Sequence, residues 1–251
     1  MIEKIFRTAY TILVAPLFFL TFLPAYISYV MVFNFSSRHN AIRHAQVVSR
    51  YWAKLAYICL LIRVKITGRE LIDKKKVYVF VSNHRSLLDV PAWAMSAYNP
   101  SKFLSKEELV KAPVFGYVLK RLYLTVNRKD KADRARSIQR MRAALEEGIS
   151  VYLAPEGTRN KNQDVDLQPF HDGDFRLAIE AQVPVAVFTL FNTDNLLSPK
   201  TLLGLRPGTI YGSWIEPIET TGLTEKDIPA LREKVWQLML KEFQQLKARY
   251  N

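Results

Sequence analysis

Residues 77–89 read VYVFVSNHRSLLD, and this stretch decides the fold class. Its first five residues are β-branched or aromatic and predict a buried strand, the polar residues after them predict a loop, and the apolar spacing from Leu88 predicts a helix. Residues 150–159, SVYLAPEGTR, repeat the order of apolar strand and polar loop. Strands that alternate with helices in this way are typical of an α/β domain, and we expect both loops at one edge of its sheet.

The same alternation continues over the rest of the chain from about residue 64. The predicted strands are 64–67, 77–81, 123–126, 150–154, 185–191 and 209–215. The predicted helices are 88–96, 107–121, 131–147, 175–181 and 225–250. We therefore expect an α/β fold with a central, mostly parallel or mixed sheet flanked by helices. Glycine-rich phosphate loops of the dinucleotide or nucleoside-triphosphate kind are absent, which argues against a dehydrogenase or a kinase.

The region before the α/β pattern is hydrophobic. Residues 8–37 contain no charged side chain, and such a stretch is long enough to cross a bilayer as a helix. Pro16 and Pro24 are expected to kink or break that helix. The alternative is a core helix buried on all sides. Residues 40–62 are amphipathic at helical spacing and predict a second helix that lies against a surface.

Basic residues flank this hydrophobic region. Residues 1–75 hold 11 Lys or Arg against 3 acids, which suits an anionic cytoplasmic leaflet. We therefore predict a two-helix membrane motif over residues 1–63 and the α/β domain over 64–251. The prolines and the amphipathic second helix favour attachment to one leaflet over a true span.

The whole chain carries 36 Lys and Arg against 23 Asp and Glu, a formal charge of +13, which predicts phosphate-bearing partners. Residues 102–142 hold 12 of these bases against 4 acids. That block is either a solvated helix face or a surface that gathers a phosphorylated acceptor, the phosphates of CoA or an acidic carrier protein. Aromatic residues do not alternate with the basic runs and no nucleic-acid motif occurs, so no nucleic-acid partner is expected.

The loop after the strand 77–81 carries His84 and Asp89. If the loop folds back, the carboxylate can accept the proton of one ring nitrogen and leave the other free to take a proton from a hydroxyl. The alternative is a surface histidine beside an aspartate that only caps a helix.

The loop after the strand 150–154 carries Glu156, Gly157, Thr158 and Arg159. Glycine lets backbone approach a ligand, threonine offers a hydroxyl, and arginine presents a planar fork that matches phosphate. The alternative is a plain turn with a solvated arginine. Together the two loops form one candidate site.

These loops and the segments around them match a known family in order along the chain. The two loop motifs are Asn83-His84-x4-Asp89 and Pro155-Glu156-Gly157-Thr158-Arg159. The further matching positions are Lys106, Glu108, Leu109, Pro113, Gly116, Arg128, Phe170, Gly173 and the run Val183-Pro184-Val185. Over about residues 60–217 the chain resembles the glycerolipid acyltransferase superfamily, and within it the bacterial 1-acyl-sn-glycerol-3-phosphate acyltransferases.

The resemblance implies transfer of a fatty acyl group from acyl-CoA or acyl carrier protein to the sn-2 hydroxyl of 1-acyl-sn-glycerol 3-phosphate, which gives phosphatidic acid in phospholipid biosynthesis. It implies that His84 is the general base and that Asp89 stabilises its imidazolium, without an acyl-enzyme. The implied phosphate ligands are Arg159, Lys106 and Arg128, and the implied acceptor-site loop is Glu156, Gly157 and Thr158. We expect Glu156 to orient Arg159 or contact the acceptor, and amides near His84 to supply the oxyanion hole.

The expected partners are membrane lipid, lysophosphatidic acid and the acyl donor, at the cytoplasmic face of the bacterial inner membrane. The four histidines form no cluster with cysteines or paired carboxylates, so no metal and no cofactor are expected. One alternative keeps the chemistry but changes the acceptor to glycerol 3-phosphate, another lysophospholipid or a lyso-aminolipid. The other is a basic protein without enzymatic activity that binds lipid or nucleic acid.

Overall fold

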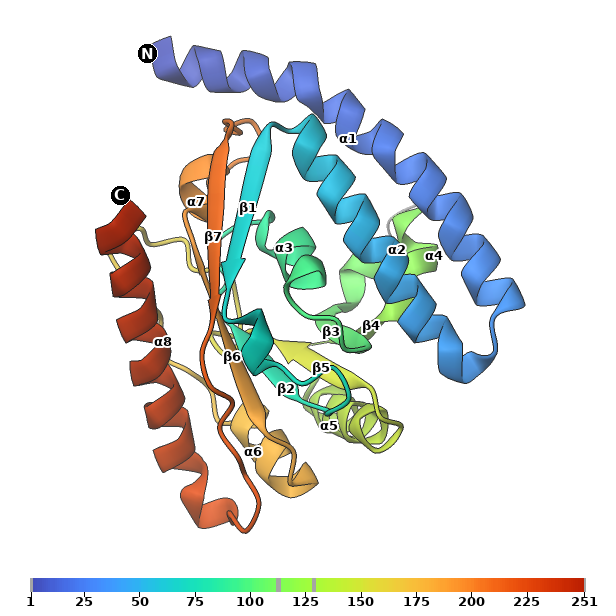
Figure 1. Ribbon diagram of the computed structural model, residues 1–251, viewed down its shortest axis with the longest axis vertical. Helices are drawn as coiled ribbons and strands as arrows, with labels where there is room; N and C mark the ends of the chain where they lie inside the picture. Colours follow the sequence, from blue (N-terminus) through green and yellow to red (C-terminus); the bar gives the residue numbers. More distant parts are fainter. Residues whose placement is uncertain (1, 112–113, 128–129, 251) are drawn as a thin grey trace.

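A computed structural model describes residues 2–111, 114–127 and 130–250. Within them one mixed sheet has the strand order β1-β7-β6-β2-β5-β3-β4 (Figure 1). The strands are β1 (Ile62–Thr67), β2 (Val79–Ser82), β3 (Ser101–Lys106), β4 (Tyr123–Val126), β5 (Ser150–Leu153), β6 (Val185–Phe191) and β7 (Gly208–Trp214). The α/β prediction with a mixed sheet is confirmed.

The direction of the strands places the two loops predicted to form the site at one edge. Neighbouring strands are parallel throughout the sheet except for β6 and β7, which are antiparallel. Consequently β6, β2, β5, β3 and β4 all end on the same side. The loops after β2 and β5 therefore lie side by side, because these two strands pair directly, with Val81 opposite Leu153.

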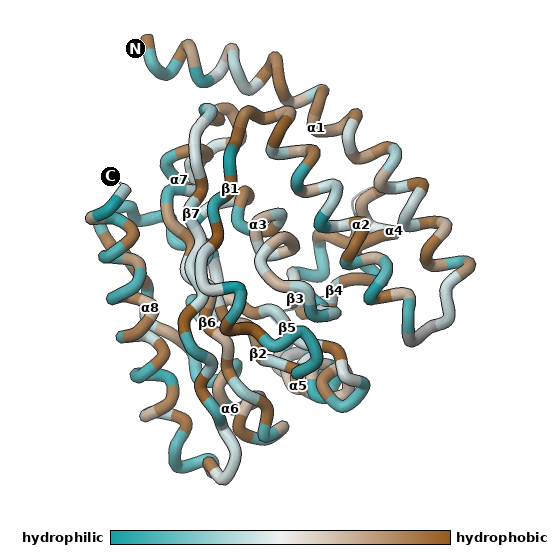
Figure 2. The backbone as a smooth tube through the Cα atoms, viewed as in Figure 1, coloured by the Kyte–Doolittle hydropathy of each residue, from teal (hydrophilic) through white to brown (hydrophobic). Residues whose placement is uncertain are grey.

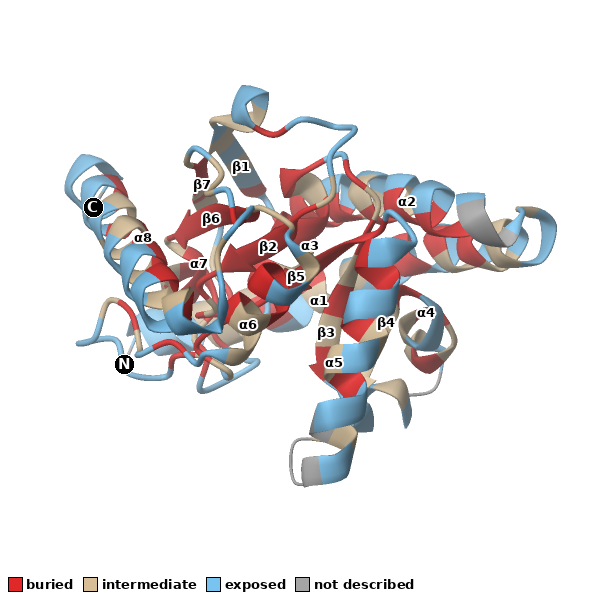
Figure 3. Cartoon of the chain, turned by 90° about the horizontal axis from the view of Figure 1, so that it is seen from below, coloured by how far each residue is buried: buried red, intermediate tan, exposed pale blue. Residues whose placement is uncertain are grey.

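Helices cover both faces of the sheet. They are α1 (Ile2–Phe35), α2 (Arg38–Cys59), α3 (Asp89–Ser96), α4 (Phe115–Leu122), α5 (Lys131–Glu146), α6 (Gly173–Ala181), α7 (Thr193–Leu196) and α8 (Ile228–Tyr250), with short 3-10 helices η1 (Arg69–Leu71), η2 (Glu107–Lys111) and η3 (Glu225–Asp227). Figure 3 shows buried strands between helices whose outer faces are exposed.

The apolar alternation along the strands explains this layering. In β2, Val79 and Val81 point to a core shared with α5, α6 and α8. Phe80 points to the opposite face, where it joins a core with α3 and the end of α2. Strands that are apolar on both faces are stable only when both faces are covered, as they are here.

The hydrophobic N-terminal region forms α1, which packs along α2 (Figures 1 and 2). Pro16 and Pro24 were expected to kink or break the helix, and they do not break it, since both lie inside one helix. Figure 1 shows that this helix bends along its course, as a helix does when proline removes a backbone hydrogen bond.

Aromatic packing holds α1 and α2 against the rest of the fold. The ring of Phe22 stacks on Phe115 of α4 with 4.1 Å between centroids. It also meets the edge of Trp52 on α2 at 5.3 Å. At the other end of the helices, Tyr10 donates a hydrogen bond to the carbonyl of Leu60 at 2.8 Å. These contacts join α1 to α2 at two places along the pair and join α1 to α4.

The prediction missed or merged several elements. Strand β3 was not predicted, because its sequence SKFLSK alternates only weakly and holds no β-branched residue. A single helix was predicted over 107–121. The structure instead has the 3-10 helix η2 and the α-helix α4, and residues 112–113 between them are outside the described residues. The four-residue helix α7 was also missed. A helix this short carries too little periodicity to be recognised.

Candidate active site

His84 and Asp89 come together at the edge of the sheet where β2 ends. Asp89 is the first residue of α3, and its side chain is completely buried. His84 Nδ1 lies 2.7 Å from Asp89 Oδ2. The histidine side chain is 18% exposed, so the imidazole has a buried partner on one side and an accessible face on the other.

The surroundings of Asp89 define which nitrogen of His84 carries the proton. The same oxygen, Oδ2, also accepts hydrogen bonds from the backbone N–H groups of Arg85 at 2.6 Å and Ser86 at 2.7 Å. An oxygen that faces two N–H donors acts as an acceptor for the ring as well, so the ring proton lies on Nδ1. The lone pair of Nε2 is then available to receive a proton from a substrate.

Trp93 of α3 supports the imidazole from one side. Its ring centroid lies 5.0 Å from that of His84. Trp93 is itself fixed by a hydrogen bond from its indole Nε1 to Ser82 Oγ at 3.0 Å. The orientation of His84 is therefore set by a carboxylate and by an anchored aromatic ring.

The carboxylate of Glu156 bonds to backbone on both sides of the site. Oε1 accepts the backbone N–H of His84 at 2.9 Å, and Oε2 accepts the backbone N–H of Gln168 at 3.0 Å. Burial raises the pKa of Glu156 to about 7, while these two N–H groups lower it by less. Among the contacts that the structure describes, Glu156 thus orients the His84 loop and not Arg159.

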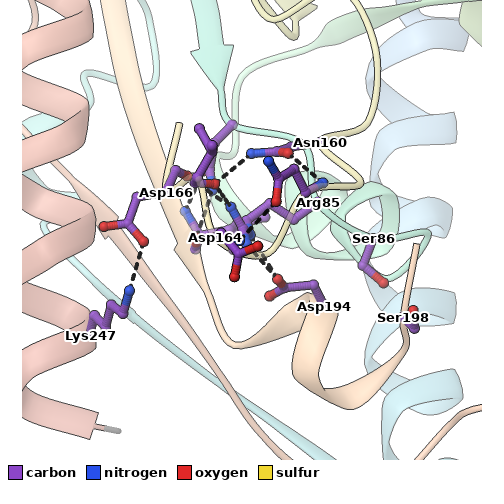
Figure 4. Close-up of polar contacts among 12 residues, drawn as sticks. Arg85, Ser86, Asn160, Asp164, Asp166, Asp194, Ser198 and Lys247 are labelled. Atoms are coloured by element: carbon purple, nitrogen blue, oxygen red, sulfur yellow. Dashed lines mark hydrogen bonds and ion pairs between the residues drawn. The ribbon is translucent and has the colours of Figure 1, made fainter. Parts of the chain in front are cut away.

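A buried arginine in the same loop was not singled out from the sequence. The guanidinium of Arg85 is 4% exposed and pairs with Asp194 Oδ2 at 2.8 Å. It also donates to the carbonyls of Val165 and Asp166 at 2.9 Å. Figure 4 shows Arg85 between Asp194 and the segment that carries Asp164 and Asp166. Arg85 therefore ties the His84 loop to two segments that are distant in sequence.

The loop of Gly157, Thr158 and Arg159 follows β5 and opens to solvent. Gly157 has a φ of 70°, and a Cβ there would meet His171 Cδ2 at 2.8 Å, so this position favours glycine. Thr158 and Arg159 line an open pocket of about 510 Å³. The other residues around this pocket are Lys161, Asn162, Gln168 and Lys200.

The other two predicted phosphate ligands are Lys106 and Arg128. Lys106 ends β3 and is exposed, on the same side of the sheet as Arg159, but it is not among the residues that line the pocket of Arg159. Arg128 lies outside the described residues. The sequence did not point to Lys161 or Lys200, which do line that pocket, because neither belongs to a motif.

The amides of the His84 loop are already bonded. Those of Arg85 and Ser86 donate to Asp89, and that of His84 donates to Glu156. The expectation that amides near His84 form the oxyanion hole therefore does not fit these three groups. Their hydrogen bonds hold the loop in place instead.

The family assignment agrees with this geometry. A family model described as Acyltransferase matches residues 63–190, just over half of the chain. The chain belongs to the acyltransferase family. The matched region runs from β1 almost to the end of β6 and includes His84, Asp89 and the 156–159 loop.

Curated relatives and one solved structure carry related names. The 1-acyl-sn-glycerol-3-phosphate acyltransferase alpha of Mus musculus is 30% identical over 74% of this chain and 65% of its own length. The 1-acyl-sn-glycerol-3-phosphate acyltransferase of Saccharomyces cerevisiae is 28% identical over 77% of this chain and 64% of its own. The chain thus spans just under two thirds of the length of these relatives.

The similarity in fold extends over the whole chain. The crystal structure of the 1-acyl-sn-glycerophosphate acyltransferase of Thermotoga maritima matches 100% of this chain and 98% of its own, with a TM-score of 0.80 and 24% identity. The agreement therefore includes the N-terminal helices as well as the sheet.

Proposed function

We propose that this protein transfers a fatty acyl group from a thioester donor, acyl-CoA or acyl carrier protein, to the sn-2 hydroxyl of 1-acyl-sn-glycerol 3-phosphate. The product is phosphatidic acid. The observation that carries the proposal is the pair of His84 Nδ1 and Asp89 Oδ2 at 2.7 Å, on the sheet edge that also holds the cationic loop of Arg159. The names of the relatives support the choice of acceptor.

His84 acts as the general base in this reaction. Nε2 takes the proton of the sn-2 hydroxyl while the oxygen attacks the thioester carbonyl, and Asp89 stabilises the imidazolium that forms. The tetrahedral intermediate then collapses, the carbon–sulfur bond breaks, and His84 returns the proton to the departing thiolate. One carbon–oxygen bond forms, one carbon–sulfur bond breaks, and the proton passes from the hydroxyl through His84 to the thiolate.

Transfer is direct, without an acyl-enzyme, because the serines beside His84 are already engaged. Ser86 is buried and its hydroxyl donates to the carbonyl of Leu197 at 2.7 Å. Ser82 is buried and donates to the carbonyl of Asn83 at 3.2 Å while it accepts from Trp93. Neither hydroxyl is available to attack a thioester, and no covalent intermediate is needed.

The N-terminal helices attach the enzyme to the membrane as a motif over residues 1–63, with the catalytic domain over 64–251. Large apolar side chains on the outer side of α1 are exposed, among them Leu13 at 73% and Leu20 at 64%. Exposed apolar surface of this extent marks contact with lipid or a partner. The basic residues around it support a location at the cytoplasmic face of the bacterial inner membrane.

The His84→Ala variant tests the proposal. We expect kcat to fall roughly 10²–10⁴-fold, with unchanged circular dichroism and vesicle binding. The assay supplies 1-acyl-sn-glycerol 3-phosphate with acyl-CoA and, separately, with acyl carrier protein, and detects phosphatidic acid by mass spectrometry. Near-normal turnover in the variant would refute the role of His84.

The acceptor is tested in the same assay with the wild-type protein. Glycerol 3-phosphate, another lysophospholipid and a lyso-aminolipid are offered beside 1-acyl-sn-glycerol 3-phosphate. The proposed acceptor should give the highest kcat/KM. Faster acylation of another acceptor would identify that compound as the substrate. The role of His84 as general base would be unaffected.

A further inference from the structure

Three cationic side chains around one pocket have no carboxylate partner in the part of the chain that the structure describes. Arg159, Lys161 and Lys200 all line the pocket of about 510 Å³. Within the described part of the chain, none of the three forms an ion pair. Other basic residues do pair, for example Arg232 with Asp172 at 2.8 Å and Lys247 with Asp166 at 2.8 Å. A pocket with three unpaired cations is suited to an anionic ligand.

Asn160, beside the pocket, and Gln168, which lines it, connect the pocket to the His84 loop. The backbone N–H of Asn160, next to Arg159, donates to the carbonyl of His84 at 2.7 Å. Gln168 lines the pocket, and its backbone N–H donates to the same Glu156 carboxylate that accepts the backbone N–H of His84. An anion held here therefore lies beside the loop that carries the general base.

The segment that carries Lys200 is attached to the N-terminal turns of α1. Thr8 Oγ1 donates to the carbonyl of Leu203 at 3.3 Å, and the N–H of Leu205 donates to Thr11 Oγ1 at 3.0 Å. The neighbouring Leu202 is 66% exposed. The pocket is thus bordered by an apolar loop that continues the exposed apolar surface of α1.

We infer that Lys161 and Lys200 complete, with Arg159, the site for the phosphate of the acyl acceptor. This inference rests on the proposed function. In 1-acyl-sn-glycerol 3-phosphate only two carbons and an ester oxygen separate the sn-2 hydroxyl from phosphorus, so the phosphate must lie close to His84. In acyl-CoA the whole pantetheine arm separates the thioester from the nearest phosphate. An amphipathic acceptor also suits a pocket with an apolar border, because its acyl chain can stay in the lipid.

The experiment compares Lys161→Gln and Lys200→Gln with Lys75→Gln. Lys75 is exposed and lies before β2, at the opposite edge of the sheet, so its variant loses the same charge without touching the pocket. We expect each pocket variant to raise KM for 1-acyl-sn-glycerol 3-phosphate about fivefold, the factor of one partly exposed ionic contact. The KM for the donor, kcat, and the transfer rate to a monoacylglycerol without phosphate should be unchanged. Lys75→Gln should behave as wild type.

Direct binding separates the two sources of phosphate. Calorimetry on the detergent-solubilised full-length protein uses glycerol 3-phosphate for the acceptor and adenosine 3′,5′-bisphosphate for the donor. Binding of glycerol 3-phosphate that is about fivefold weaker in the pocket variants, with unchanged binding of the bisphosphate, supports the inference. The inference is overturned if both variants keep the acceptor KM and the binding of glycerol 3-phosphate. It is also overturned if the KM for the donor rises and the binding of the bisphosphate weakens.

The outcome remains distinct from that of the proposed function. If the wild-type protein acylates no lysophosphatidic acid, the proposed function fails. Glycerol 3-phosphate binding that weakens when Lys161 or Lys200 is replaced would still establish the phosphate site. Binding that is the same in both variants as in the wild type would overturn the inference.

Discussion

At the scale of single residues, the site depends on two buried carboxylates that serve different purposes. Asp89 gives one oxygen to the ring of His84 and to two amides, so it sets both the tautomer of the base and the shape of its loop. Among the described contacts Glu156 accepts hydrogen bonds from backbone alone, and it joins the His84 loop to Gln168. In the proposed mechanism Asp89 thus acts on His84 directly, whereas Glu156 acts through the position of the His84 loop.

Asp89→Asn separates the charge of this residue from its hydrogen bonds. The amide oxygen of asparagine can replace Oδ2 as acceptor for the backbone, but it cannot stabilise an imidazolium. We expect kcat to fall roughly 10²–10⁴-fold with little change in KM. Steady-state kinetics with varied acceptor measures both constants. A rise in KM alone would assign Asp89 to binding.

The raised pKa of Glu156 should make the free energy of unfolding depend on pH. Its pKa of about 7 in the folded protein lies above the ordinary value of 4.5. Between these values the folded state binds more protons than the unfolded state, so the free energy of unfolding falls as pH rises, by about 3 kcal/mol for this residue. Urea denaturation from pH 4.5 to pH 8 should show this slope in the wild type and lack it in Glu156→Gln.

The same variant also has a direct cost. Glutamine can accept only one of the two amide N–H groups, and the other is left without a partner, at about 1–3 kcal/mol. Glu156→Gln should therefore be less stable than the wild type at pH 5, and the difference should shrink toward pH 8. Parallel stability curves for the two proteins would show that Glu156 does not titrate in this range.

At the scale of elements, the close approach of α4 to η2 depends on Gly116. A Cβ at this position would lie 2.2 Å from the carbonyl oxygen of Val110, and backbone cannot yield as a flexible side chain can. We expect Gly116→Ala to reduce the free energy of unfolding by about 1–3 kcal/mol, measured by urea denaturation.

Gly173 offers a matched control for this substitution. It begins α6, and a Cβ there would meet nothing within 4 Å. Gly173→Ala should leave stability unchanged or raise it slightly, since alanine loses less backbone entropy than glycine. Equal losses in both variants would mean that the contact between α4 and η2 does not limit stability.

The elements also show which features a sequence can reveal. The strands β4 and β6 were predicted to the residue: Pro184 and Asn192 bound the apolar run of β6, and Asn127 ends that of β4. Strand β3 escaped because packing, not local composition, makes SKFLSK a strand. In the site, the pairing of His84 with Asp89 follows from short spacing. The contact of Arg85 with Asp194 spans 109 positions and required the fold.

At the scale of the whole molecule, hydrophobic and basic features lie at the same end of the fold. The apolar side chains of α1 extend past the loop of Leu202 and Leu203, and the cationic pocket opens beside that loop. A protein built in this way can rest on lipid through α1 while its pocket meets the headgroups. Part of the net charge of +13 would then bind phosphate groups near the membrane surface.

Substitutions on the outer side of α1 test this arrangement. Leu13→Glu and Leu20→Glu each replace an exposed apolar side chain and should lower partitioning into phosphatidylglycerol vesicles about tenfold or more. Vesicle sedimentation measures the bound fraction. Leu71→Glu, at an exposed position on η1, is the matched control and should bind as wild type. Equal binding by all variants would place the membrane contact elsewhere.

The bonds around Arg85 and Glu156 have a consequence for turnover. To open, the His84 loop would have to break a buried ion pair and several amide hydrogen bonds together, so its local unfolding is costly. The base is therefore in position before either substrate arrives. In the proposed reaction the acyl acceptor would then reach a stationary site by lateral diffusion in the plane of the bilayer, while acyl-CoA or acyl carrier protein would reach it from the aqueous side.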